Sequence, residues 1–178
     1  MRRVSPIAIL TRSALLLAVI LAAQAFHLPQ MITGPLVNAV LIFAVLTTGL
    51  SSGLLLSILA VVGSFLLGFM KLPLPPLIIL IMAANVVLVV VFYAFKGHGG
   101  HNSYGRFFAA MVTGAVAKYM LFYFGLNQLF VWMGMEVPAP ILVTFGITQL
   151  FTALIGGTLA IFIDGIIGGE RRRMHQSW

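Results

Sequence analysis

Lys118 is the residue of this sequence whose chemistry most needs a partner. It lies in an otherwise apolar run, twelve residues after Arg106, which corresponds to about 18 Å along a helix. If that run crosses a bilayer, a charge at this depth costs from about 2.5 to more than 10 kcal/mol unless a partner compensates it. Asp164 is the one carboxylate inside an apolar run, and it lies toward the end of the last one. Three interpretations stay open: Lys118 is buried and neutral, it extends along a polar crevice toward water, or it meets the negative group of a ligand.

Other polar side chains in the apolar runs could join Lys118 in a pocket. These are Tyr119, Tyr123 and Asn127 on a neighbouring stripe of the same run, Asn85 in the run before it, and Gln149 in the run after it. An apolar pocket with a few convergent polar groups is typical of small-molecule sites. The same residue types also hydrogen-bond transmembrane helices to one another. Taken alone, each of these side chains fits that second role at least as well.

The composition places these residues in an integral membrane protein. Of 178 residues, 61% are hydrophobic and 7% are charged, and the mean hydropathy is +1.14. A bilayer span needs roughly 20 apolar residues, and suitable runs lie at approximately 7–26, 35–50, 52–70, 77–95, 105–133 and 141–167. We therefore expect an all-α membrane protein, a compact bundle of six transmembrane helices. It would form a single domain over 1–170, followed by a short basic cytoplasmic tail over 171–178.

The basic residues predict the orientation of this bundle. Short cytoplasmic loops retain Lys and Arg, and with six spans all the basic residues except Lys71 and Lys118 fall on the side of the two termini. Both termini are therefore expected in the cytoplasm. The net charge of +7 then reflects this bias and an attraction to anionic lipid. Nucleic-acid binding is not expected, because it would need a basic surface outside the membrane.

The first run also has the pattern of a secretory signal, with Arg2-Arg3 before it and Ala23-Gln24-Ala25 at its end. Its apolar region is longer than a usual signal core, although Arg12 interrupts it. Removal of this run would leave five spans, with termini on opposite sides. We therefore expect a retained first helix.

The predicted connections differ between the two sides. The outer ones, at 27–35, 71–76 and 134–140, all contain proline, which fixes φ and cannot donate a backbone hydrogen bond. They are expected either to lie as stiff caps over the bundle or simply to end the helices. The inner connection at 96–106 is rich in glycine and is expected to be flexible.

Catalytic patterns are sparse. The four histidines fall in predicted connections or in the tail, and His98 and His101 have no cysteine or acidic third ligand close by. The sequence has neither a Gly-x-Ser-x-Gly motif nor a phosphate-binding Gly-x-x-x-x-Gly-Lys-Ser/Thr motif. We therefore expect no enzyme, no metal site, no cofactor and no ATP-binding part.

The whole chain resembles the substrate-binding S component of an energy-coupling factor (ECF) transporter. The resemblance rests on six spans in fewer than 200 residues, on both termini inside, on a ladder of small residues in the first span, and on the stretch 30–39. The ladder consists of Ala14, Ala18 and Ala22, and the stretch reads Gln30-x-x-Thr33-Gly34-Pro35-Leu36-Val37-Asn38-Ala39. Small residues at i, i+4 spacing let helices approach closely in a bilayer.

The resemblance implies high-affinity binding of a vitamin or related micronutrient, in a pocket capped by the first outer loop. It implies docking through Ala14, Ala18 and Ala22 onto a transmembrane coupling subunit that carries two ATPases, in the plasma membrane of a prokaryote. The substrate-binding residues that it implies are Gln30, Thr33, Asn38, Asn85, Lys118, Tyr119, Tyr123, Asn127 and Gln149.

Two alternatives stay open beside this interpretation. The membrane subunit of the rod-shape morphogenesis complex resembles S components in size and number of spans, and it serves as a scaffold. In that case Lys118 would extend toward water and no ligand would exist. A lone secondary carrier is the other alternative, but its coupling ion would normally need a membrane carboxylate, and Asp164 is the one candidate.

Overall fold

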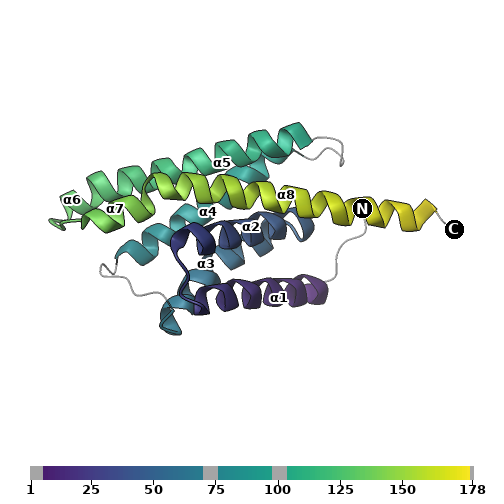
Figure 1. Ribbon diagram of the computed structural model, residues 1–178, viewed down its shortest axis with the longest axis horizontal. Coiled ribbons are helices and arrows are strands. Elements are labelled where there is room, and N and C mark those ends of the chain that lie inside the picture. Colours follow the sequence, from purple (N-terminus) through teal and green to yellow (C-terminus); the bar gives the residue numbers. More distant parts are fainter. Residues whose placement is uncertain (1–5, 70–75, 98–103, 177–178) are drawn as a thin grey trace.

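The computed structural model describes residues 6–69, 76–97 and 104–176, with the backbone alone given for 168–176. Every regular element in these ranges is helical, which confirms the prediction of an all-α protein (Figure 1). The helices are α1 (Pro6–Ala25), α2 (Gln30–Thr47), α3 (Leu50–Leu66), α4 (Pro76–Lys96), α5 (Tyr104–Phe124), the π-helical turn η1 (Gly125–Leu129), α6 (Phe130–Trp132), α7 (Ala139–Phe145) and α8 (Ile147–Gln176).

Five segments of the described chain are long and apolar enough to cross a membrane, as expected for a multi-pass membrane protein. They are Pro6–Ala25, Gln30–Thr47, Pro76–Lys96, Tyr104–Trp132 and Ala139–Ile167. Helix α3 has 17 residues and lies in the same bundle, so it is at the lower limit of about 17–25 residues for a span. The start of α1 and the end of α8 lie at the same end of the bundle (Figure 1).

The second helix begins earlier than predicted. Residues through Pro35 were expected to belong to the first outer connection, but α2 starts at Gln30 and holds Pro35 as a buried residue inside it. Pro29 has the extended backbone of a residue just before a helix, with ψ 149°. Pro35 lacks the backbone N–H that would bond the carbonyl four residues earlier, yet its φ is compatible with a helix, so the chain continues through it.

The described prolines of the outer connections mark helix starts. Pro76 is the first residue of α4, Pro138 immediately precedes α7, and Pro140 is the second residue of α7. Proline suits this place because the first N–H groups of a helix have no partner within the helix. These described prolines therefore begin helices instead of ending them. Most of the predicted connection at 71–76 lies outside the described residues.

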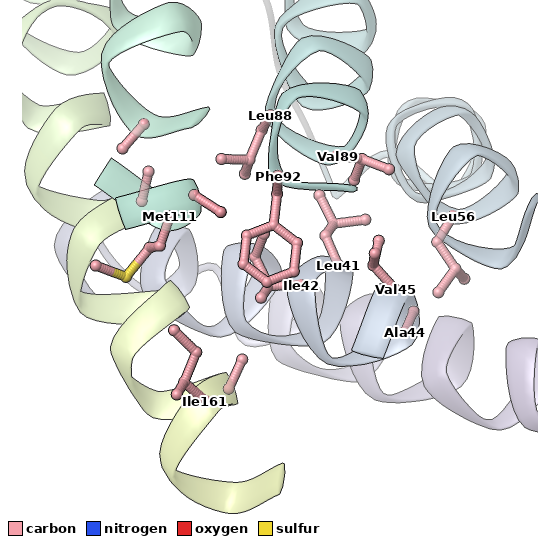
Figure 2. Close-up of a cluster of buried hydrophobic side chains, with 14 of the residues drawn as sticks. Leu41, Ile42, Ala44, Val45, Leu56, Leu88, Val89, Phe92, Met111 and Ile161 are labelled. Carbon is pink, nitrogen blue, oxygen red and sulfur yellow. The ribbon is translucent and has the colours of Figure 1, made fainter. Parts of the chain in front are cut away.

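Two apolar clusters hold the bundle together. One, shown in Figure 2, joins Leu41 and Ile42 of α2 to Phe92 of α4, Met111 of α5 and Ile161 of α8. The other lies toward the opposite end and centres on large buried side chains of α4, α5 and α6, among them Leu77, Phe122 and Phe130. The closest helix pairs are α2 with α8 and α4 with α5. The polar residues described below lie between these two clusters.

Helix α1 is the most peripheral of the long helices. Its buried residues are Ser13 and Ile20, and it packs against α3 and α2. Ser13 hydrogen-bonds Ser52 of α3, and near the other end of α1 the Oε1 of Gln24 accepts a hydrogen bond from Ser64. Two polar contacts along one side therefore hold α1 against α3, and much of its remaining surface faces outward.

Candidate functional site

Lys118 is buried in the bundle and is bonded to two asparagines. Its side chain is 3% exposed, and its Nζ donates to Asn38 Oδ1 at 2.7 Å and to Asn85 Oδ1 at 2.8 Å. These residues come from α5, α2 and α4, so the structure brings together three residues that the sequence analysis selected separately. Lys118 does not extend toward water. Both described partners of its amine are neutral amide oxygens.

The polar contacts continue from α2 into α8. Asn38 Nδ2 donates to Thr152 Oγ1 at 3.4 Å, and Thr152 Oγ1 donates to the backbone oxygen of Gln149 at 3.1 Å. Asn38, Thr152 and Gln149 are all buried. A network of this kind fixes the rotamer of each member, because a buried polar group without a partner is costly.

Close packing of α2 on α8 makes this network possible. A Cβ atom on Gly156 would collide with the backbone oxygen of Pro35 and would lie 2.8 Å from both the backbone N of Ala39 and the Cβ of Asn38. A Cβ on Gly34 would lie 2.8 Å from Cγ2 of Thr152. Glycine at these two positions lets the backbones approach closely, as small residues commonly do between transmembrane helices.

A pocket of about 110 Å³, here called the chamber, lies beside Lys118. Its described lining is Gln24, Gln30, Thr33, Gly34, Val37, Asn38, Ala60, Val61, Ile81, Asn85, Lys118, Phe145 and Gln149. On α2 the lining residues recur at i, i+3, i+4, i+7 and i+8 from Gln30, which is one face of a helix. Six predicted site residues therefore share one cavity: Gln30, Thr33, Asn38, Asn85, Lys118 and Gln149.

The other three predicted site residues lie outside the chamber lining. Tyr119 is half-buried, whereas Tyr123 and Asn127 are exposed. The two tyrosine rings lie beside each other at 6.2 Å between centroids, and Asn127 Nδ2 donates to the backbone oxygen of Tyr123 at 2.9 Å. Tyr119 and Tyr123 each directly follow a residue of the stripe formed by Lys118 and Phe122, which rotates them by about 100° around α5, so they face another side of that helix. Asn127 lies beyond α5, in η1.

Gln24 and Phe145 line the chamber but were not selected from the sequence. Gln24 was considered there only as part of a signal-like pattern, although a glutamine at the end of an apolar span was a usable signal. Phe145 ends α7, and its ring lies 5.5 Å from that of Phe122. The helix is interrupted at Gly146, between α7 and α8. No sequence pattern predicts how such an interruption orients the neighbouring aromatic ring.

A second cavity of about 210 Å³, here called the vestibule, adjoins the chamber. It is lined by Gln24, His27, Leu28, Gln30, Thr33, Ser64 and Phe69, so three of its residues also line the chamber. His27 and Leu28 follow α1, at the end of the bundle opposite the start of α1. His27 has a left-handed φ of 50°, and its ring meets Phe69 edge to face at 6.1 Å.

The chamber contains one cationic group and no described carboxylate. Glu136 lies in the connection before α7, and Asp164 lies close enough to Lys96, at the opposite end of the bundle from the vestibule, to interact with it electrostatically. Neither acid lines either cavity. The described residues form no cluster of three potential metal ligands, and His98 and His101 lie outside them.

The predicted docking face is open in this chain. Ala14, Ala18 and Ala22 are all exposed on α1, on the side away from Ser13 and Ile20. They lie one above another at i, i+4 spacing. A strip of methyl side chains along one helix therefore faces away from the bundle.

Comparisons with protein families, with curated proteins and with solved structures find no match to this chain. The evidence on function therefore comes from two features of the chain itself, the polar residues of the chamber and the exposed surface of α1.

Proposed function

We propose that this chain binds a vitamin or a related micronutrient with high affinity, as the substrate-binding S component of an ATP-driven ECF importer. The observation that carries the proposal is Lys118, buried at the wall of a mainly apolar chamber with a few polar side chains, which adjoins a vestibule at one end of the bundle. In this role the chain performs no chemistry. Partner ATPases hydrolyse ATP, and the solute is released on the side of the termini.

The free energy of the buried amine supports a ligand. A charged lysine in the middle of a bilayer costs from about 2.5 to more than 10 kcal/mol. Its hydrogen bonds to Asn38 and Asn85 recover about 1.5–3 kcal/mol each, as bonds to charged groups do. These bonds offset the lower part of that range but not the upper part. An anionic ligand beside Lys118 would supply the remainder.

The size of the cavities fits a small solute that extends through both. Pockets for drug-sized ligands usually have volumes of about 300–1,000 Å³. The chamber of about 110 Å³ and the vestibule of about 210 Å³ are each too small, but they share Gln24, Gln30 and Thr33. A solute spanning that shared boundary would fill a volume near the lower limit.

The exposed alanine ladder supports a partner on α1. Because the side chains of this strip are small, a second helix can approach α1 closely. The pair then gains dispersion contacts that lipid tails cannot match. In the proposed complex Ala14, Ala18 and Ala22 contact the coupling subunit. Six spans then place both termini in the cytoplasm, where the basic residues satisfy the positive-inside rule. The proposed location is the plasma membrane of a prokaryote.

One observation favours a second candidate, a scaffold subunit of a cell-shape or envelope assembly complex. Lys118 already donates two hydrogen bonds inside the bundle, so its amine has partners even without a ligand. In a scaffold the chamber would hold water alone. The alanine ladder would then bind another protein of the assembly.

Ala18→Trp separates these roles. The tagged chain is purified from membranes of its own host, and its co-purifying proteins and small molecules are identified by mass spectrometry. The importer predicts a transmembrane subunit and two ATPases with the wild type, their loss in Ala18→Trp, and an unchanged content of small molecule. Ala109→Trp, an equally bulky change at an exposed site of α5, should retain the partners. Partners without ATPases, and no small molecule in any variant, would instead indicate the scaffold.

A further inference from the structure

We infer that the solute bound in the chamber carries a single carboxylate, which lies deepest in the bundle beside Lys118, while its neutral polar remainder extends through the vestibule. This inference rests on the proposed function and goes beyond it in naming the substrate class and its orientation. It follows from the directions of the hydrogen-bond donors, from the charge of the lining, and from the order of the two cavities.

The amine of Lys118 determines how the two asparagines are oriented. A lysine ammonium has three donors and no acceptor, and two of those donors are directed to Asn38 Oδ1 and Asn85 Oδ1. The third donor remains for another acceptor. Because both amide oxygens face the amine, the amide nitrogens face elsewhere, and Asn38 uses its nitrogen to bond Thr152. Asn85 lines the chamber, and its amide nitrogen is directed away from Lys118.

Gln24, at the boundary between the chamber and the vestibule, is oriented like the two asparagines, because its side-chain oxygen also accepts a hydrogen bond from the protein. Gln24 accepts a hydrogen bond from Ser64 through Oε1, which directs its own Nε2 donors away from Ser64. Gln24 lines both the chamber and the vestibule. The donors left for a solute include the third one of Lys118 and the amide nitrogens of Asn85 and Gln24, whereas Gln149 Nε2 and Thr33 Oγ1 already donate to backbone oxygens. A carboxylate complements these donors, because an ionised carboxylate only accepts hydrogen bonds and has about four sites for them.

The charge of the lining distinguishes a carboxylate from a phosphate ester. Lys118 is the one cationic side chain among the described residues of the chamber, and these residues include no acid. A carboxylate brings one negative charge and balances the lysine. A phosphate monoester brings about −1.5 to −2 at neutral pH and would leave excess negative charge beside buried residues. Phosphate sites usually balance this negative charge with arginine. The described chamber lining contains no arginine.

The arrangement of the cavities sets the orientation of the solute. Lys118 lines the chamber but not the vestibule, whereas His27 and Phe69 line the vestibule but not the chamber. The acid group must therefore pass the boundary formed by Gln24, Gln30 and Thr33 to reach its counter-charge. The vestibule offers an aromatic edge and neutral polar groups, which suits an uncharged ring or amide-bearing portion of the solute.

Asn85→Asp tests the inference without creating a cavity in the core. This change keeps the volume of residue 85 and gives Lys118 a carboxylate partner from within the protein, so the fold should persist. The new charge lies beside the position that the inference gives to the solute's acid group, and it neutralises the lysine before the solute arrives. Gln128→Glu makes the same chemical change at an exposed residue of η1, outside the described lining of both cavities, and serves as the matched control.

The probes are biotin, nicotinate, pantothenate and lipoate, their uncharged amide or alcohol analogues, riboflavin, thiamine, and pyridoxal phosphate. Wild-type protein in nanodiscs is incubated with this mixture, and retained compounds are measured by mass spectrometry and then titrated individually. We expect retention of one monocarboxylate, with its uncharged analogue binding at least about tenfold more weakly. Asn85→Asp should weaken binding of the monocarboxylate by about 100-fold or more, because like charges repel strongly in a buried site. Gln128→Glu should bind as the wild type does.

The outcomes separate the two claims. Retention of riboflavin, thiamine, an uncharged analogue or pyridoxal phosphate in place of a monocarboxylate would overturn the inference and leave the proposed function standing. Equal binding of a monocarboxylate by the wild type and Asn85→Asp would overturn its placement beside Lys118. Failure of the folded wild type to retain any probe would count against the proposed function and the inference together.

Discussion

Gly156→Ala tests whether close contact between α2 and α8 builds the chamber. The added Cβ would collide with the backbone oxygen of Pro35 and lie 2.8 Å from both the backbone N of Ala39 and the Cβ of Asn38. None of these three is the movable end of a long side chain. The two helices must therefore separate, and Asn38, which accepts a hydrogen bond from Lys118, must move with α2.

The expected cost has two parts. Inserting one methyl group into a well-packed interior usually costs about 1–3 kcal/mol. If the separation also breaks the bond from Lys118 to Asn38, the loss of a hydrogen bond to a charged group adds about 1.5–3 kcal/mol. The free energy of unfolding should thus fall by at least about 1 kcal/mol. Solute retention should fall too, because the chamber wall has moved.

Unfolding in mixed micelles, followed by circular dichroism as sodium dodecyl sulfate is added, measures this change. Gly105→Ala is the matched control, because a Cβ on Gly105 would have no heavy atom within 4 Å in the described structure. It should leave the stability unchanged or raise it by up to about 1 kcal/mol. A Gly156→Ala protein as stable as the wild type, with solute retention unchanged, would refute the proposed role of this helix contact.

Two further substitutions test how peripheral elements are held. Ser13→Ala removes the bond to Ser52 and should lower the free energy of unfolding by about 0.6 kcal/mol, the average for such bonds between transmembrane helices; Ser51→Ala, at an exposed neighbour, should have no effect in the same titration. Phe145→Ala removes the ring that packs on Phe122 and lines the chamber, so thermal unfolding of the protein in detergent should occur at a lower temperature. An unchanged thermal transition would show that α7 contributes little to the bundle.

Hydropathy predicted the positions of the long helices closely, because an apolar run that crosses a bilayer must be about as long as the bilayer is thick, although α3 is shorter than the run predicted for it. The ends of the helices were less predictable. Pro35 looked like the end of a loop, but it lies inside α2, where it gives up one intrahelical hydrogen bond while its φ still fits the helix. The π-helical turn over Gly125–Leu129 also lacks any signal in the apolar pattern of the sequence.

The candidate site was predictable as a set of residue types but not as a set of contacts. A charged lysine in a span needs polar partners, and this requirement directed attention to Asn85 and Gln149 in neighbouring spans, whereas Asn38 was selected only through the family resemblance. Which of them reach Lys118 depends on how α2, α4 and α5 rotate about their axes. That rotation brings Asn38 and Asn85 to the amine, and it leaves Tyr123 exposed on another side of α5.

The most direct test of the proposed function is the amount of vitamin retained per chain by the wild type and by Lys118→Met. Met has nearly the length of Lys but lacks its charge and its donors, and circular dichroism would first establish that the variant is folded. Quantitative mass spectrometry after incubation with the vitamin mixture should find close to one molecule per wild-type chain and almost none per variant chain. Equal retention by the two proteins, or an empty wild type, would contradict a solute site at Lys118.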